Sequence, residues 1–215
     1  MTVGAAEITK LIDELRAAKR PVFCSERDFQ LQLAWQMKGC GWEVAMEYNP
    51  QKPNVRIDIF VYKPERVAVE LKYKQALYNG EFEGLPLSLK SHNAQDHGRY
   101  DFWKDIWRLE KVVDESLAVR GFAIFLTNDG LYCDTVGQQY SSAMFSMCNG
   151  PKPRGNRSWS GNPAAGTTKG RPAFDLTRDY ECGWKDYVKF DSKNGLFRYL
   201  LVEVEPAPAA TPRTA

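Results

Sequence analysis

Apolar side chains recur every three or four positions in three segments of the chain, residues 7–19, 25–39 and 100–115. This spacing places the apolar side chains of each segment on one face of a helix. Ser25 opens the second segment and Asp28 follows three positions later, where the two polar side chains of a capping box belong. The pattern predicts three helices that each turn an apolar face to a core.

Shorter runs rich in β-branched and aromatic residues predict strands. Residues 56–62 and 66–73 flank a short loop around Pro64, and this arrangement predicts an antiparallel hairpin. The continuous apolar run 121–126 has the length of a buried strand. Further strands are predicted at residues 42–48 and, as a hairpin, within residues 184–205.

In chain order these elements are two helices, three strands, a helix, a strand and a hairpin, which predicts a mixed α/β fold. Strand, helix and strand normally connect right-handedly, so the strand at 121–126 is expected in the sheet of the first hairpin. The chain of 215 residues predicts a single domain over residues 1–205. Residues 76–98 and 137–183 are predicted to be irregular, and the Pro/Ala-rich residues 206–215 to be disordered.

The composition is that of a soluble globular protein, with 43% hydrophobic and 26% charged residues. No apolar run approaches the ~20 residues of a membrane span, and no signal-peptide core is present, so no membrane association is expected. Five cysteines without a CxxC spacing argue against a zinc site and a disulfide framework, and favour a reducing, cytoplasmic compartment. The net charge of +2 means that any phosphate-binding surface must come from local patches.

Asp58 and Glu70 lie on the two strands of the predicted hairpin. A loop centred on Pro64 puts them opposite each other, and cross-strand partners share a face with Cβ atoms roughly 5 Å apart. Lys72 shares this face because side chains alternate along a strand. Two opposed carboxylates repel each other, and a divalent cation relieves the repulsion. The apolar neighbours are expected to point into a core: Ile57, Ile59, Val69 and Leu71.

The acid-x-lysine spacing alone is weak evidence, because it recurs at residues 191–193. That copy runs into Asn194-Gly195, a strong turn signal, and is therefore expected at the tip of a hairpin. Only the copy at Glu70 lies within a predicted strand and faces an acid. A charged outer face of an antiparallel sheet is the alternative explanation for it.

Asp58, followed on the next strand by Glu70-Leu71-Lys72, resembles the signature of the PD-(D/E)XK nuclease superfamily. This superfamily includes many restriction endonucleases and Holliday junction resolvases. Ile57 stands where the motif has its proline, a position that varies in the superfamily. The resemblance implies a restriction endonuclease-like core of helix, three antiparallel strands, helix and strand, here extended by an N-terminal helix and a C-terminal hairpin.

The resemblance also implies phosphodiester hydrolysis with Mg²⁺ or Mn²⁺. Asp58, Glu70 and the backbone carbonyl of Leu71 then bind the metal ion, and Lys72 positions the attacking water. Glu26, in the first turn of the second helix, matches a glutamate that often helps to bind metal in such nucleases. The helix dipole alone also favours a glutamate there, so both explanations stay open.

Basic and aromatic residues near the expected site are candidates for contacts with nucleic acid. Arg99, Tyr100 and Lys104 lie at the start of the third helix, which flanks the active site in the superfamily, and Lys74 follows the catalytic motif. Ordinary capping and surface charge explain these residues equally well.

The segment 150–172 is rich in Gly, Pro, Ser and Thr, and it holds Trp159 and several basic residues but no acid. A loop of this kind suits phosphate contact and base stacking. An exposed insertion without a partner agrees with the sequence equally well. The candidates in this segment are Arg154, Arg157, Lys169 and Arg171.

Together these features predict a metal-dependent endonuclease acting on DNA, of the kind used in restriction, phage defence or repair. The alternatives are an RNA-directed nuclease and a catalytically silent binding or regulatory subunit with the same fold. Attack at strand ends, a homodimer and a separate partner chain stay open.

Overall fold

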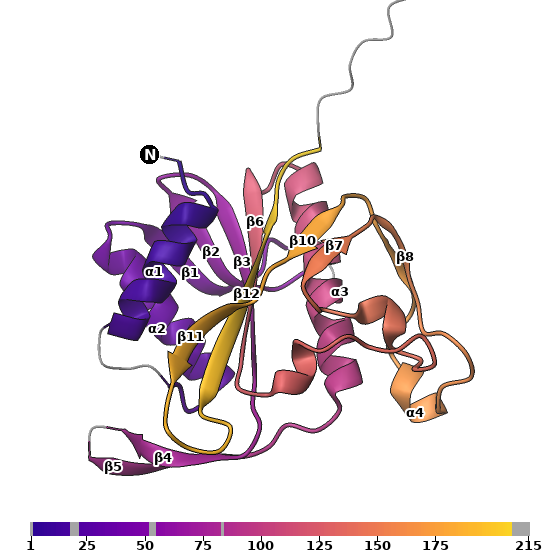
Figure 1. Cartoon of the computed structure of the whole chain (residues 1–215). Coiled ribbons are helices and arrows are strands. Elements are labelled where there is room, and N and C mark those ends of the chain that lie inside the picture. Colours follow the sequence, from indigo (N-terminus) through magenta and orange to yellow (C-terminus); the bar gives the residue numbers. More distant parts are fainter. Residues whose placement is uncertain (1, 18–21, 52–54, 83, 208–215) are drawn as a thin grey trace, which may run out of the picture.

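The computed structural model describes residues 2–17, 22–51, 55–82 and 84–207. At its centre is a six-stranded sheet whose strands lie in the order β1 (Glu43–Tyr48), β2 (Ile57–Lys63), β3 (Val67–Lys74), β6 (Arg120–Thr127), β12 (Leu196–Val204) and β11 (Lys185–Lys189) (Figure 1). β3 and β6 run parallel, and the other neighbours in this sheet run antiparallel. The fold is therefore mixed α/β with a mostly antiparallel sheet, and β6 belongs to the sheet of the first hairpin as predicted, where it lies beside β3.

Helices cover both faces of this sheet (Figure 1). α1 (Ala5–Ala17) and α2 (Glu26–Gly39) pack on one face, and α3 (Gln95–Asp114) packs on the other. Side chains of β6 alternate between the two cores, because successive residues of a strand point to opposite faces. Phe122, Ile124 and Leu126 join the core under α1 and α2, whereas Ala123 and Phe125 join the core under α3.

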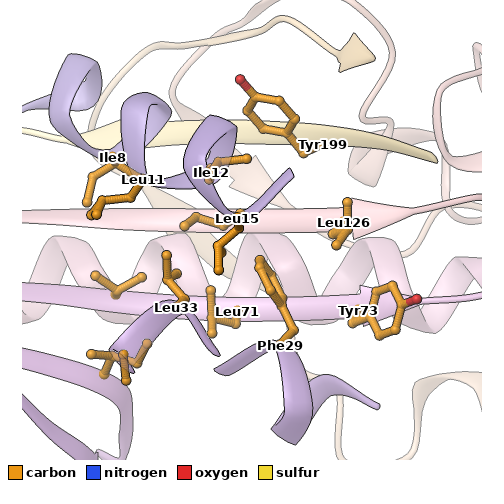
Figure 2. Packing of buried hydrophobic residues seen from close by; sticks show 14 of the residues in the cluster. Ile8, Leu11, Ile12, Leu15, Phe29, Leu33, Leu71, Tyr73, Leu126 and Tyr199 are labelled. Carbon is orange, nitrogen blue, oxygen red and sulfur yellow. The ribbon is translucent and has the colours of Figure 1, made fainter. Parts of the chain in front are cut away.

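The core under α1 and α2 fixes how these helices lie on β3. Figure 2 shows Leu15 of α1 and Phe29 of α2 beside Leu71 of β3, and each of these side chains is almost completely buried. α2 begins as the capping pattern predicts, since the Ser25 hydroxyl accepts a hydrogen bond from the Asp28 amide at 3.1 Å. This packing brings the start of α2 close to the end of β3.

The predicted helices are confirmed, with shifted ends. α1 begins at Ala5, and residues 18–19 of the predicted helix lie outside the described residues. α3 begins at Gln95, five positions before the predicted start. The prediction missed its first turns because they are polar and contain Gly98. Among the described residues, no helix is long and apolar enough to cross a membrane.

Residues 76–98 are not irregular throughout, which corrects the prediction. They contain the antiparallel pair β4 (Tyr78–Phe82) and β5 (Leu85–Leu89), which projects from the sheet (Figure 1). Gly80 and Pro86 are residue types that strands disfavour, so they concealed this pair in the sequence. Tyr78 anchors the pair, with its ring 5.5 Å from the ring of Phe197.

Residues 137–183 are likewise more regular than predicted. Strands of three residues are too short to show an alternating pattern, and here they pair with partners distant in sequence. β7 (Gly150–Lys152) pairs with β10 (Tyr180–Cys182), and β8 (Gly155–Arg157) pairs with β9 (Phe174–Leu176). The short helices of this part of the chain are η1 (Gly130–Tyr132), η2 (Ala143–Phe145) and α4 (Ala165–Thr168). Residues 208–215 of the predicted disordered tail lie outside the described residues.

Glu110 fastens this region to α3. Its buried carboxylate accepts hydrogen bonds from the amides of Thr177 and Arg178 and from the hydroxyl of Tyr180, at 2.9–3.1 Å. These donors lie in and beside β10, so one side chain of the helix holds a turn far away in the sequence.

Glu110→Ala is expected to lower the free energy of unfolding by about 3 kcal/mol, because three donors lose a charged acceptor inside the protein. Urea denaturation followed by circular dichroism measures this loss. Asp114→Ala is the matched control, since it removes an exposed carboxylate from the same helix that pairs with Arg178. The control should cost about 1 kcal/mol or less, and equal losses in the two variants would contradict the role assigned to Glu110.

Candidate active site

The candidate site lies where β2 and β3 separate. Ile59 pairs with Val69 and Val61 pairs with Val67, so the hairpin has the predicted register, centred on Pro64. The same register would place Asp58 opposite Glu70, but the ladder ends at Ile59. Beyond that point a side chain replaces the partner strand: the Leu71 amide donates to Oδ2 of Asp58 at 2.7 Å.

Glu26 of α2 also takes the place of a β2 acceptor at this edge of β3. The amide of Tyr73 donates to Oε2 of Glu26 at 2.8 Å, and Nε2 of Gln30 donates to the carbonyl of Asp58 at 2.6 Å. Leu71 and Tyr73 are two residues apart, so their amides point to the same side of β3, toward β2. Asp58 and Glu26 therefore both satisfy backbone donors at the open edge of β3, and this fixes where their carboxylates lie.

Glu70 and Lys72 face α3 from the neighbouring positions of β3. The side chain of Glu70 is 3% exposed, and its Oε2 lies 3.4 Å from Nη2 of Arg108. Nζ of Lys72 lies 2.6 Å from Oδ2 of Asp105 and donates to the Leu71 carbonyl at 3.0 Å. Arg108 also contacts Oδ1 of Asp105 at 2.5 Å. These four side chains form one chain of ion pairs between β3 and α3.

The sequence analysis missed two members of this chain of ion pairs, Arg108 and Asp105. The side chain of Asp105 is 3% exposed, and it lies on the face of α3 that packs on the sheet, beside Phe102 and Ile106. An acid within the apolar stripe of a helix is rarely buried without a partner. That break in the stripe was the available signal for a functional or paired carboxylate.

Asp58 and Glu26 lie near these four ion-paired side chains, and the six together form a carboxylate cluster with a formal excess of negative charge. Asp58, Glu70, Glu26 and Asp105 supply four carboxyl groups, while Lys72 and Arg108 supply two cations. Burial raises the pKa of Asp58, and the nearby charge of Lys72 only partly opposes the shift. Burial and the charge of Asp105 raise the pKa of Glu70 well above its usual range.

The pKa values of the two cations of the cluster, Lys72 and Arg108, are also raised, which favours their charged forms. Burial lowers the pKa of Lys72, but the surrounding carboxylates, Asp105 first among them, outweigh burial, and the net pKa is raised. The pKa of Arg108 is also raised, because Asp105 and Glu70 outweigh its burial. Lys72 therefore stays protonated, and the negative charge of the cluster resides on its carboxyl groups. A hollow of about 240 Å³ gives access to Lys72 and Asp105.

Ile57 corrects the prediction that four apolar neighbours share one core. Ile59, Val69 and Leu71 join the core under α1 and α2, but Ile57 joins the core under α3. The pairing of β1 with β2 skips Glu47, whose φ of +54° interrupts the regular alternation opposite Asp58. The irregularity coincides with the point at which Asp58 leaves the ladder.

Three of the predicted nucleic-acid contacts are buried, which corrects that part of the prediction. Arg99 donates to the carbonyl of Leu131 at 2.5 Å, and the hydroxyl of Tyr100 donates to the carbonyl of Pro172 at 2.8 Å. Arg157 is 5% exposed and donates to the nearby backbone carbonyl groups of Asn156 and Pro153. These side chains hold segments together and are not available on the surface.

The other candidates differ in position. Trp159 stacks on Tyr100, with ring centroids 5.7 Å apart, so it belongs to the packing under the insertion. Lys104 lines the hollow that reaches Lys72. Nε of Arg171 lies 3.7 Å from Asp101. Lys74 is half-buried, and Arg154 and Lys169 are exposed.

In the part of the chain that the structure describes, no group of three or more His, Cys, Asp or Glu side chains is arranged to hold a metal ion by itself. Comparison with protein families, with curated protein sequences and with solved structures identifies no match. The functional argument therefore depends on the geometry and charge of the cluster.

Proposed function

We propose that this chain is a metal-dependent nuclease that hydrolyses phosphodiester bonds in DNA, with a site resembling that of the PD-(D/E)XK superfamily. The observation that carries the proposal is the meeting of Asp58, Glu70 and Lys72 at the opening between β2 and β3, within a cluster that has excess negative charge. Buried carboxylates in such a cluster are costly unless a cation compensates them.

The donor set fits Mg²⁺ or Mn²⁺. Both ions prefer oxygen ligands, and Mg²⁺ keeps several waters while it binds one or two carboxylates. Asp58 and Glu70 would supply those carboxylates, and the carbonyl of Leu71 and the side chain of Glu26 lie at the same opening.

When bound, the metal ion supplies Lewis-acid stabilisation of charge on the scissile phosphate and lowers the pKa of a water. Lys72 is held by the Leu71 carbonyl and by Asp105, so its ammonium group is fixed beside the carboxylates. In this place it orients the attacking water and stabilises charge that develops on a phosphate oxygen. Asp105 is a positioning residue, since it acts through Lys72.

The order and pairing of the elements support the proposal. α2, β1, β2, β3, α3 and β6 follow one another in the order of a restriction endonuclease-like core, with the first three strands antiparallel and β6 parallel to β3. Restriction, phage defence and repair are the settings in which such enzymes act.

A second candidate function is a binding or regulatory subunit without catalysis, and one observation favours it. Asp58 and Glu26 satisfy backbone amides, and Lys72 is fully paired with Asp105, so every member of the motif already has a structural partner. Such a subunit has no need of a metal ion, and metal titration separates the two functions.

Isothermal titration with Mg²⁺ and Mn²⁺ is expected to give an affinity that rises with pH. The metal ion binds ionised carboxylates, while burial holds the pKa of Glu70 and Asp58 above their usual range. At pH values below the raised pKa, metal binding must therefore displace protons. In that range the affinity rises by about tenfold per pH unit for each proton that is released. Affinity that does not change with pH would contradict this role of Glu70, and no metal binding would favour the regulatory subunit.

A further inference from the structure

A groove that is lined by three basic side chains and by apolar ones runs along α3, beside the insertion. Lys104, Arg108 and Lys111 recur every three or four positions, so they share one face of the helix. Together with Trp107 they line a groove of about 640 Å³, and Gly170 and Pro172 of the insertion line it as well. One acid, Glu115, also lines this groove.

This groove is continuous with the carboxylate cluster. Lys104 and Arg108 line both the groove and the smaller hollow that contains Lys72 and Asp105. Arg108 itself reaches Glu70, at 3.4 Å. A linear polymer in the groove would therefore pass from the cations of α3 toward Lys72.

The cations of the groove are gathered around an aromatic ring. Nζ of Lys104 lies 3.4 Å from the centre of the Trp107 ring, and Nζ of Lys111 lies 3.6 Å from it. Burial, together with the charges of Lys111 and Arg108, lowers the pKa of Lys104. The groups repel one another, and a bound phosphate would relieve this repulsion. Cationic side chains beside an aromatic ring are a combination that proteins use to bind single-stranded nucleic acid.

We propose that this groove binds the unpaired strand of nucleic acid next to the scissile phosphate. Lys104 and Lys111 contact successive phosphates, and Trp107 stacks on a base after the two ammonium groups have moved to those phosphates. An unpaired strand is favoured over a duplex because a base must be free to reach the indole between α3 and the insertion. The position of the scissile phosphate rests on the proposed function, whereas strand binding in the groove does not.

The test is fluorescence anisotropy with a short fluorescein-labelled oligothymidylate and with a blunt duplex, both in EDTA so that cleavage cannot interfere. Lys104→Gln/Lys111→Gln should weaken binding of the oligothymidylate by at least about tenfold. The slope of log affinity against log salt should also fall, by roughly 0.7 for each phosphate that the variant no longer neutralises. Lys10→Gln/Lys38→Gln is the control with the same change of charge, on exposed positions of α1 and α2.

A second pair of variants tests the aromatic contact. Trp107→Leu should weaken binding of the oligothymidylate by at least about fivefold and binding of the duplex much less, because base stacking needs an unpaired base. Trp35→Leu is the matched control, since Trp35 is 73% exposed on α2. Circular dichroism establishes that each variant is folded, and the lysine variants test the groove even if Trp107→Leu does not fold.

Equal loss of oligothymidylate affinity in the groove and control variants would contradict binding in the groove. An unchanged affinity in Lys104→Gln/Lys111→Gln would contradict it as well. If the duplex binds as tightly as the single strand and Trp107→Leu has no effect, the preference of the groove for an unpaired strand would be contradicted. These outcomes do not depend on catalysis. If the groove variants lose binding but the wild-type protein cleaves no nucleic acid, strand binding in the groove would be supported and the proposed nuclease activity would be rejected.

Discussion

Lys72→Ala is expected to reduce metal-dependent cleavage of DNA by at least about 10²-fold, the usual effect of removing one electrostatic stabiliser from an active site. Nζ of Lys72 is held between the Leu71 carbonyl and Asp105, beside the carboxylates that would bind the metal. The change removes the group proposed to orient the water and leaves the apolar cores intact. Cleavage of supercoiled DNA, measured beside circular dichroism, gives both readouts.

The chain provides a matched control for this change. Lys193 ends the second acid-x-lysine sequence, and it lies exposed in the turn between β11 and β12. Lys193→Ala should retain wild-type cleavage. If Lys72→Ala unfolds the protein, Lys72 belongs to the scaffold, and if both variants cleave normally, the proposed site is wrong.

Glu70→Gln is expected to abolish metal binding and to stabilise the metal-free protein. Burial and the charge of Asp105 hold the pKa of Glu70 well above its usual range, and the pair with Arg108 only partly opposes them. A carboxyl group of this kind favours folding most below its unfolded pKa, about 4.3, and its contribution is lost as pH rises through the raised folded pKa. Glutamine has nearly the same shape and carries no charge, so it removes this penalty.

Urea unfolding in EDTA at a series of pH values measures the effect. At pH 8 the free energy of unfolding of the variant should exceed that of wild type, because glutamine places no charge in this buried position, and the difference should shrink toward pH 4. Asp191→Asn, an exposed acid at the other acid-x-lysine sequence, should change stability very little. A Glu70→Gln variant that is less stable at every pH would show that the carboxylate stabilises the fold through Arg108.

The hairpin that carries the motif could be predicted because it depends on local information. Residues around Pro64 define the loop, and the alternation of side chains then fixes which residues face each other. The register of β2 and β3 is confirmed, as are the Ser25 cap and the presence of β6 in the sheet of this hairpin. Each depends on residue types in one segment or on a general rule of connection.

The contacts between α3 and the sheet could not be predicted in the same way. Asp105 meets Lys72 only after the helix has packed on β3, and the sequence does not say which turn of α3 lies above Glu70. Asp58 and Glu26 gained their backbone partners for a similar reason, since the early end of the β2–β3 ladder is a tertiary feature.

The predicted nucleic-acid contacts failed where polar side chains are buried. Arginine and tyrosine are expected at the surface unless they are paired, yet Arg99 and Tyr100 donate to carbonyl groups of distant segments. Pro172, the partner of Tyr100, lies in a part of the chain that was predicted to be irregular, and Leu131, the partner of Arg99, lies in a segment for which no helix or strand was predicted.

The most direct test of the central claim is incubation of the purified protein with circular single-stranded DNA and supercoiled DNA, in Mg²⁺, Mn²⁺ or EDTA, alongside Lys72→Ala. We expect nicking or linearisation that requires the metal ion and is absent from the variant. Cleavage that persists in EDTA or in Lys72→Ala would contradict the site. Failure to cleave either circle, or linear DNA or RNA, despite metal binding would contradict the claim that this chain is a nuclease by itself.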